Sequence, residues 1–164
     1  MHLQAATVVN RTTEQVWSFF SRLSNLAKWD RSVAQVIATS PEPFGVGSTF
    51  DTIAPVRKPR AGKDGLRMAY RVTEYVPNRR FKALLIHSPM FKYAEWTMTT
   101  EEVPEGVRIT CHVDLAVRLR YSFLIPVLLL THQDAFRRDL TYLKQAIEQD
   151  QAAVLPLVAD GIVG

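Results

Sequence analysis

The N-terminal apolar and polar positions predict a strand followed by an amphipathic helix. An extended run covers residues 4–9. Thr12 and Gln15 have the spacing of a capping box, which marks the first turn of a helix. A further helical turn is expected at 26–29, before Trp29-Asp30 leads into the next strand. The first helix should carry one apolar face made of Val16, Phe19, Phe20 and Leu23.

The rest of the chain alternates apolar and polar residues between turns that contain proline, glycine or asparagine, which predicts six further strands. A long final helix should start between Tyr121 and Val127 and run to about Gln151. The expected strands cover 32–39, 48–54, 66–76, 80–87, 91–103 and 107–119. The apolar stripe of the final helix would consist of Leu129, His132, Phe136, Leu140, Leu143 and Ile147.

These elements predict an α+β fold. Six strands joined by short turns form an antiparallel meander, and the leading strand makes the sheet seven-stranded. A strongly curved sheet needs an apolar element on its concave side, and the long C-terminal helix supplies one. We expect one domain over residues 1–151 and a loosely attached tail over 152–164.

The segment VWSFFSRLSNLAKWDRSV, residues 16–33, resembles the start of the START/Bet v 1-like (SRPBCC) helix-grip superfamily, and within it the polyketide cyclase/dehydrase-type members. The resemblance covers roughly residues 1–150. It implies a curved sheet wrapped around the long helix, two short helices between the first two strands, and an internal cavity. Members of the superfamily include lipid carriers, quinone-binding proteins, plant hormone receptors and aromatase/cyclases.

Composition and motifs exclude several classes of function. The chain has 164 residues and a net charge of +4, but no recognisable nucleic-acid-binding motif. It has no apolar run long enough to span a membrane and no signal-peptide pattern, so a cytoplasmic location is expected. The single Cys111 forms no internal disulfide. The sequence has no metal-ligand spacing and no nucleophile motif, so we expect neither a bound metal nor a cofactor.

Strand parity and the helical stripe give the candidate ligand-binding residues. Most of them are apolar or aromatic and a few have polar tips, which suits a flat or lipid-like ligand. The same pattern fits a solid core, and parity does not distinguish the two. The candidates are Trp29, Phe50, Met68, Tyr70, Leu85, His87, Trp96, Met98, Cys111, Val113, Leu115, His132 and Phe136.

Three of these residues are candidates for proton transfer: His87, Tyr70 and His132. A catalytic histidine needs a partner, and Glu95 would serve if its side chain pointed inward. The alternative is that each histidine is a singly hydrogen-bonded residue of the cavity wall.

The end of the sheet that forms the cavity mouth in the resembling family is basic here: Arg57, Lys58, Arg60, Lys63, Arg118 and Arg120. These residues would attract an anionic ligand or membrane surface, or they form an ordinary solvated loop. The adjacent segment FLIPVLLL, residues 123–130, would contact a membrane or a second subunit, or would be buried with Pro126 opening the helix. The sequence is therefore compatible with a transient membrane contact, and with either a monomer or a homodimer.

These features favour binding of a hydrophobic small molecule such as a lipid, quinone or polyketide-like aromatic, with its transport as an extension of that function. The alternative is a polyketide cyclase/aromatase or dehydratase that uses histidine or tyrosine in the cavity. A third reading is an interaction module in which the cavity is incidental.

Overall fold

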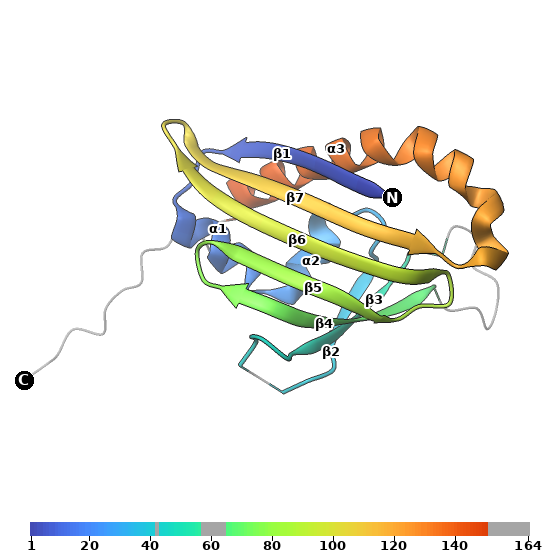
Figure 1. The fold of residues 1–164 in the computed structure, drawn as a ribbon. Coiled ribbons are helices and arrows are strands. Elements are labelled where there is room, and N and C mark those ends of the chain that lie inside the picture. The colour runs from blue at the N-terminus through green and yellow to red at the C-terminus, as the bar shows by residue number, and fades with distance from the viewer. Residues whose placement is uncertain (42, 57–64, 151–164) are drawn as a thin grey trace, which may run out of the picture.

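A seven-stranded antiparallel sheet and one long helix form the protein (Figure 1). The computed structural model describes residues 1–41, 43–56 and 65–150. The strands lie in the order β1-β7-β6-β5-β4-β3-β2, so the first and second strands of the chain form opposite edges. The strands are β1 (His2–Val9), β2 (Gln35–Ala38), β3 (Thr49–Ile53), β4 (Arg67–Val76), β5 (Arg80–His87), β6 (Phe91–Val103) and β7 (Gly106–Val117).

The connection between β1 and β2 contains the expected short helices: α1 (Thr13–Phe20), the 3-10 turn η1 (Leu23–Asn25) and α2 (Leu26–Trp29). The predicted capping box is confirmed. The Gln15 amide donates to the Thr12 hydroxyl, and the Thr12 amide donates to the Gln15 side chain. The helix therefore starts where two of its free amide groups are satisfied.

β2 is shorter than predicted because Asp30 holds the preceding chain in a turn. One oxygen of its carboxylate accepts hydrogen bonds from the amide and the hydroxyl of Ser32, at 2.9 and 2.6 Å. The Val33 amide also donates to the Asp30 carbonyl. The chain becomes extended only at Gln35.

Two tight connections depend on positive φ angles. Asn78, between β4 and β5, has φ 62°, and Gly106, at the start of β7, has φ 130°. A side chain at Gly106 would also collide with the carbonyl oxygen of Val9 on β1. Glycine is therefore required where β1, β6 and β7 meet.

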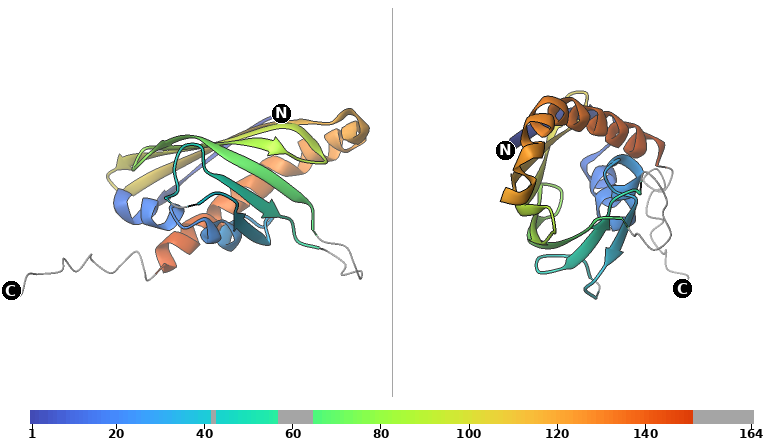
Figure 2. Two further views of the ribbon diagram at one scale, coloured as in Figure 1. Left: turned by 90° about the horizontal axis from the view of Figure 1, so that it is seen from below. Right: turned by 90° about the vertical axis from the view of Figure 1, so that its right-hand side faces the viewer.

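The long helix α3 (Ile125–Gln149) crosses the concave side of the sheet, and α1 and α2 lie on the same side (Figures 1 and 2). Its start falls within the predicted interval, after the 3-10 turn η2 (Leu119–Leu124). Leu140, Leu143 and Ile147 are fully buried in the core. Lys144 Nζ donates to the Val8 carbonyl at 2.6 Å and fixes the C-terminal half of α3 beside β1.

The predicted tail at 152–164 lies outside the described residues, and the domain limit at residue 151 stays a prediction. In the described part of the chain, no helix is both long and apolar enough to cross a membrane.

We predict that Thr12→Ala lowers the free energy of unfolding by about 1 kcal/mol, because the Gln15 amide loses its acceptor. Urea unfolding followed by circular dichroism measures the change. Thr12→Ser keeps the hydroxyl and should retain most of the stability. Equal losses in the two variants would contradict a role for the cap.

Candidate functional site

A cavity of about 360 Å³ lies between the concave face of the sheet and the helices α2 and α3. Most of the side chains that line it are apolar, and several are aromatic. Its described lining consists of Leu3, Leu26, Trp29, Asp30, Ser32, Phe50, Ala54, Leu66, Met68, Tyr70, Met90, Phe91, Ala94, Glu95, Trp96, Val113, Leu115, Ala135, Phe136 and Asp139.

Strand register brings the sheet residues of the lining together. On one side, Phe50 of β3 lies opposite Tyr70 of β4, and the two rings stack with centroids 5.5 Å apart. On the other side, Trp96 of β6 lies opposite Val113 of β7. Residues directly opposite each other in an antiparallel pair have their side chains on the same face of the sheet. All four side chains therefore lie on the concave face, which borders the cavity.

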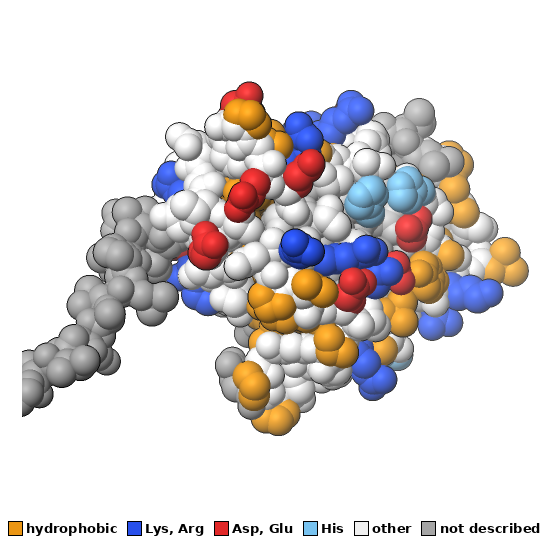
Figure 3. All heavy atoms as spheres, turned by 60° about the vertical axis from the view of Figure 1, so that its left-hand side comes forward, with side chains coloured by type: hydrophobic (Ala, Val, Ile, Leu, Met, Phe, Trp, Pro, Cys, Tyr) orange, Lys and Arg blue, Asp and Glu red, His pale blue; other side chains and the backbone are white. Residues whose placement is uncertain are grey.

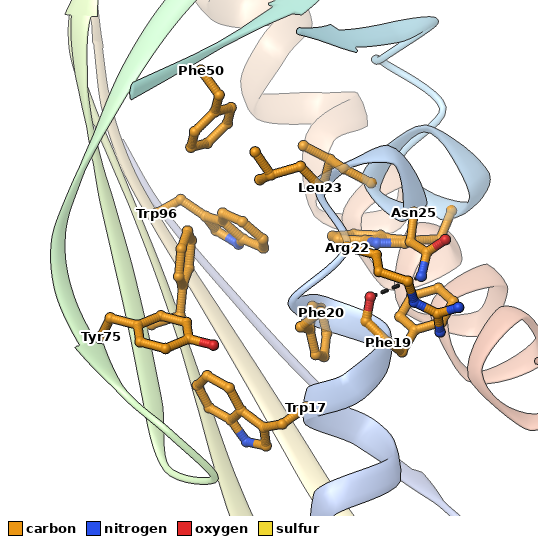
Figure 4. A pocket seen from close by; sticks show the side chains of 12 residues that line it. Trp17, Phe19, Phe20, Arg22, Leu23, Asn25, Phe50, Tyr75 and Trp96 are labelled. Carbon is orange, nitrogen blue, oxygen red and sulfur yellow. Dashed lines mark hydrogen bonds between the residues drawn. The ribbon is translucent and has the colours of Figure 1, made fainter. Parts of the chain in front are cut away.

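Trp96 also separates the cavity from a packed aromatic region. Its ring lies 6.0 Å from that of Trp29 and 5.2 Å from that of Phe81, centroid to centroid. Beyond it lies a narrow cleft of about 30 Å³, roughly the volume of one water molecule (Figure 4). In that view Tyr75 and Trp96 extend from the sheet toward Phe20 and Leu23. The interior is therefore open on one side of Trp96 and almost filled on the other.

Eight of the predicted residues line the cavity: Trp29, Phe50, Met68, Tyr70, Trp96, Val113, Leu115 and Phe136. Met98 and Cys111 do not; they face each other across β6 and β7 and are fully buried in the core. Burial raises the pKa of the Cys111 thiol to about 12. Leu85 lies opposite Tyr70 and is half-buried, but it is not part of the described cavity wall.

His87 is exposed and lies away from the cavity. The prediction from strand parity that its side chain lines the cavity is therefore wrong. The ladder between β4 and β5 changes register here: Tyr70 pairs with Leu85, whereas Ala69 pairs with His87. The extra residue, Ile86, is a bulge that places His87 with the outward-facing Ala69. The side chain of His132 lies outside the described residues.

Asp30 provides one of the polar groups of the cavity. Its Oδ1 atom accepts both bonds from Ser32, and its Oδ2 atom forms no hydrogen bond within the described part of the chain. Burial raises the pKa of this carboxyl, and the bonds from Ser32 partly offset the rise. The apolar wall thus contains an acid with an unused acceptor.

Asp139 and Tyr70 are further polar residues of the wall. Burial, and then the negative charge of Asp30, raise the pKa of Asp139 to about 6; the Arg31 amide and the charges of Arg31 and Arg138 oppose the rise. Burial and the Asp30 charge also raise the pKa of Tyr70 to about 12. Among the described lining residues there is no lysine, arginine or histidine. The cavity is therefore acidic although the chain as a whole is basic.

Asp139 is a site residue that the sequence reasoning does not identify, although the sequence holds a signal for it. It follows Phe136 by three residues and precedes Leu140 by one, so it is an acidic residue beside the apolar stripe of α3. Asp30 enters that reasoning only as part of the Trp-Asp turn. A charged residue beside a buried apolar stripe indicates either that its charge is paired with another side chain or that it borders an internal cavity.

Glu95, the conditional partner of an inward histidine, does not pair with His87. Glu95 borders the cavity, but its carboxylate pairs with Lys82 at 3.0 Å and accepts a bond from Tyr93 at 3.2 Å. Arg108 and Glu101 form another pair at 3.1 Å on the convex face of the sheet. Figure 3 shows a surface on which acidic and basic side chains are interspersed. We therefore place the candidate chemistry in the cavity.

Of the predicted basic mouth, the structure describes only the C-terminal part. Arg118 Nε donates to the Ser88 carbonyl at 3.2 Å, and Arg120 donates to the Pro89 carbonyl at 2.8 Å. These bonds hold the start of η2 beside the turn that leads to Met90 and Phe91 of the cavity wall. Arg57, Lys58, Arg60 and Lys63 lie outside the described residues.

Of the predicted segment 123–130, the structure describes the side chains of Phe123, Ile125 and Pro126, and all three are exposed. Phe123 is 71% exposed, and Leu119, just before the segment, is 87% exposed. For the residues the structure describes, no group of three or more histidine, cysteine or acidic side chains is placed to hold a metal ion.

A family model described as polyketide cyclase/dehydrase and lipid transport matches residues 1–148. A protein from Thermus thermophilus is 16% identical with a TM-score of 0.71, covering 90% of this chain and 97% of that chain. The Zhui aromatase/cyclase from Streptomyces sp. R1128 is 13% identical with a TM-score of 0.68, covering 93% and 97%. A START superfamily protein from Mycobacterium smegmatis is 15% identical with a TM-score of 0.66, covering 94% and 99%. No curated protein sequence matches the chain.

At these identities the likeness shows the fold, and it confirms the predicted helix-grip architecture.

Because the pKa of Asp139 is raised from 3.8 to about 6, the folded state is favoured at low pH and loses this advantage as the pH rises through about 6. We predict that Asp139→Asn, which cannot ionise, becomes more stable relative to the original protein between about pH 4 and about pH 8. Urea unfolding at both pH values measures the difference. Asp134→Asn, an exposed position on the same helix, serves as the matched control. A stability difference for Asp139→Asn that is independent of pH would contradict the shifted pKa.

Proposed function

The chain belongs to the polyketide cyclase/dehydrase and lipid transport family, and from that premise we propose that it binds a hydrophobic small molecule in the cavity beside Trp96. The cavity itself is the observation that carries the proposal. Its volume of about 360 Å³ is in the range of small-molecule sites, and its wall combines apolar surface with few polar groups.

The shape of the wall favours a ligand with a flat or flexible apolar body. Trp29, Phe50, Tyr70 and Trp96 offer aromatic surface, whereas Leu115 and Met68 offer aliphatic surface. Contact with such surfaces releases water from both partners. A lipid, a quinone and a polyketide-like aromatic all meet this description.

A pair of alanines on adjacent strands tests the cavity. Ala94 faces the cavity, whereas Ala116 is exposed on the neighbouring strand. We predict that Ala94→Phe fills the cavity and weakens binding of the neutral fluorophore N-phenyl-1-naphthylamine by about tenfold or more. Ala116→Phe should bind it like the original protein. Fluorescence titration measures both affinities, and equal affinities would reject the cavity as the binding site.

Catalysis is the second candidate function, and Tyr70 and Asp139 are the observation in its favour. A tyrosine with a pKa of about 12 stays protonated and can donate a hydrogen bond, and a carboxyl with a pKa of about 6 can exchange a proton near neutral pH. His87 contributes nothing to this arrangement. A reconstituted polyketide reaction whose products are the same with the original protein, with Tyr70→Phe and with Asp139→Asn would reject this candidate.

We also propose that the exposed residues of η2 contact an anionic membrane when the ligand is exchanged. Leu119 and Phe123 are exposed beside the basic Arg118 and Arg120, a combination that suits the interface of an anionic bilayer. Leu119→Ser with Phe123→Ser should abolish flotation with phosphatidylserine-containing liposomes. The exposed Val46→Ser, in the loop between β2 and β3, serves as the control. A protein that does not float with these liposomes would refute the contact.

A further inference from the structure

We propose that the cavity selects ligands that carry a protonated amine on an apolar body. This inference rests on the proposed binding function and specifies the chemical class of the ligand. Three acidic side chains line the cavity. Glu95 is paired with Lys82 at 3.0 Å. The described lining offers no basic residue to neutralise the other two, Asp30 and Asp139. An anionic ligand would meet repulsion there, whereas an ammonium group would meet attraction.

Asp30 is already oriented to receive such a group. Its Oδ1 atom is engaged by the two bonds from Ser32, which fix the carboxylate at the end of α2. Its Oδ2 atom forms no hydrogen bond within the described part of the chain. Asp30 is half-buried, and a carboxylate oxygen with a free acceptor position in such a partly desolvated site forms a strong hydrogen bond with a charged donor.

Asp139 reaches the same part of the cavity from α3. Asp30, Asp139 and Tyr70 all line this one cavity, and the charge of Asp30 contributes to the raised pKa of both Asp139 and Tyr70. The positive charges of Arg31 and Arg138 lower the pKa of Asp139 and oppose the rise caused by burial. The guanidinium of Arg31, however, is held by the Tyr142 hydroxyl at 2.9 Å and lies 5.1 Å from that ring.

The aromatic wall supports the same class of ligand. Trp29 and Trp96 have centroids 6.0 Å apart, and Tyr70 and Phe50 stack at 5.5 Å, all within the lining of the cavity. Aromatic ring faces attract cations, and sites that combine such rings with a carboxylate favour alkylammonium groups. The rest of the lining then accommodates the apolar body.

Three ligands with the same chain test the selection: decylamine, decanol and decanoate, each below its micelle concentration and near neutral pH. We expect isothermal titration calorimetry to show that decylamine binds about tenfold or more tightly than decanoate, with decanol between them. Asp30→Asn together with Asp139→Asn should bring decylamine to the affinity of decanol, while Asp134→Asn on the same helix should leave it unchanged. Asparagine keeps an acceptor for Ser32, and each single variant should show part of the effect.

The pH dependence gives an independent readout. The preference for decylamine over decanol should fall as the pH drops through about 6, where Asp139 takes up a proton. If decanol binds but decylamine shows no preference, or if the asparagine variants keep the preference, the amine selection is wrong and the hydrophobic site stands. If none of the three ligands binds, both proposals fail.

Discussion

The contact of Trp96 with Trp29 and Phe81 divides the interior into a filled part and a hollow part. Trp96 stands on the sheet between two smaller neighbours, Ala83 on β5 and Val113 on β7, and this leaves room for its ring to lie across the interior. Aromatic pairs of this kind each contribute about 0.5–1.5 kcal/mol beyond the burial of their area. The packed core ends at this ring, and the cavity begins there.

The sequence predicted the elements well because their signals are local. The ranges predicted for β5 and β6 match the structure, since alternation is strong in both and turn residues flank them. Thr12 and Gln15 marked the start of α1 because a capping box involves only neighbours in the chain. Parity placed Met68 and Tyr70 correctly because β4 pairs with β3 in one unbroken register across both residues.

Other features of the site depend on contacts that no local pattern records. A single extra residue, Ile86, turned His87 to the outer face, and a bulge of this kind has no firm signature in one sequence. Met98 and Cys111 have the parity of cavity residues, yet they lie where the core is filled. The boundary between core and cavity is set by the packing of rings from distant segments, which alternation does not encode.

The two halves of α3 have different surroundings, and this separation bears on how such a chain diverges. Leu140, Leu143 and Ile147 hold the C-terminal part of α3 in the core, whereas Ala135, Phe136 and Asp139, which precede them in the chain, line the cavity. Substitutions at Ala135 or Asp139 leave these three core residues unchanged. Ligand preference can therefore drift between descendants of one ancestral gene while the scaffold persists, which is what a family with one architecture and many chemistries requires.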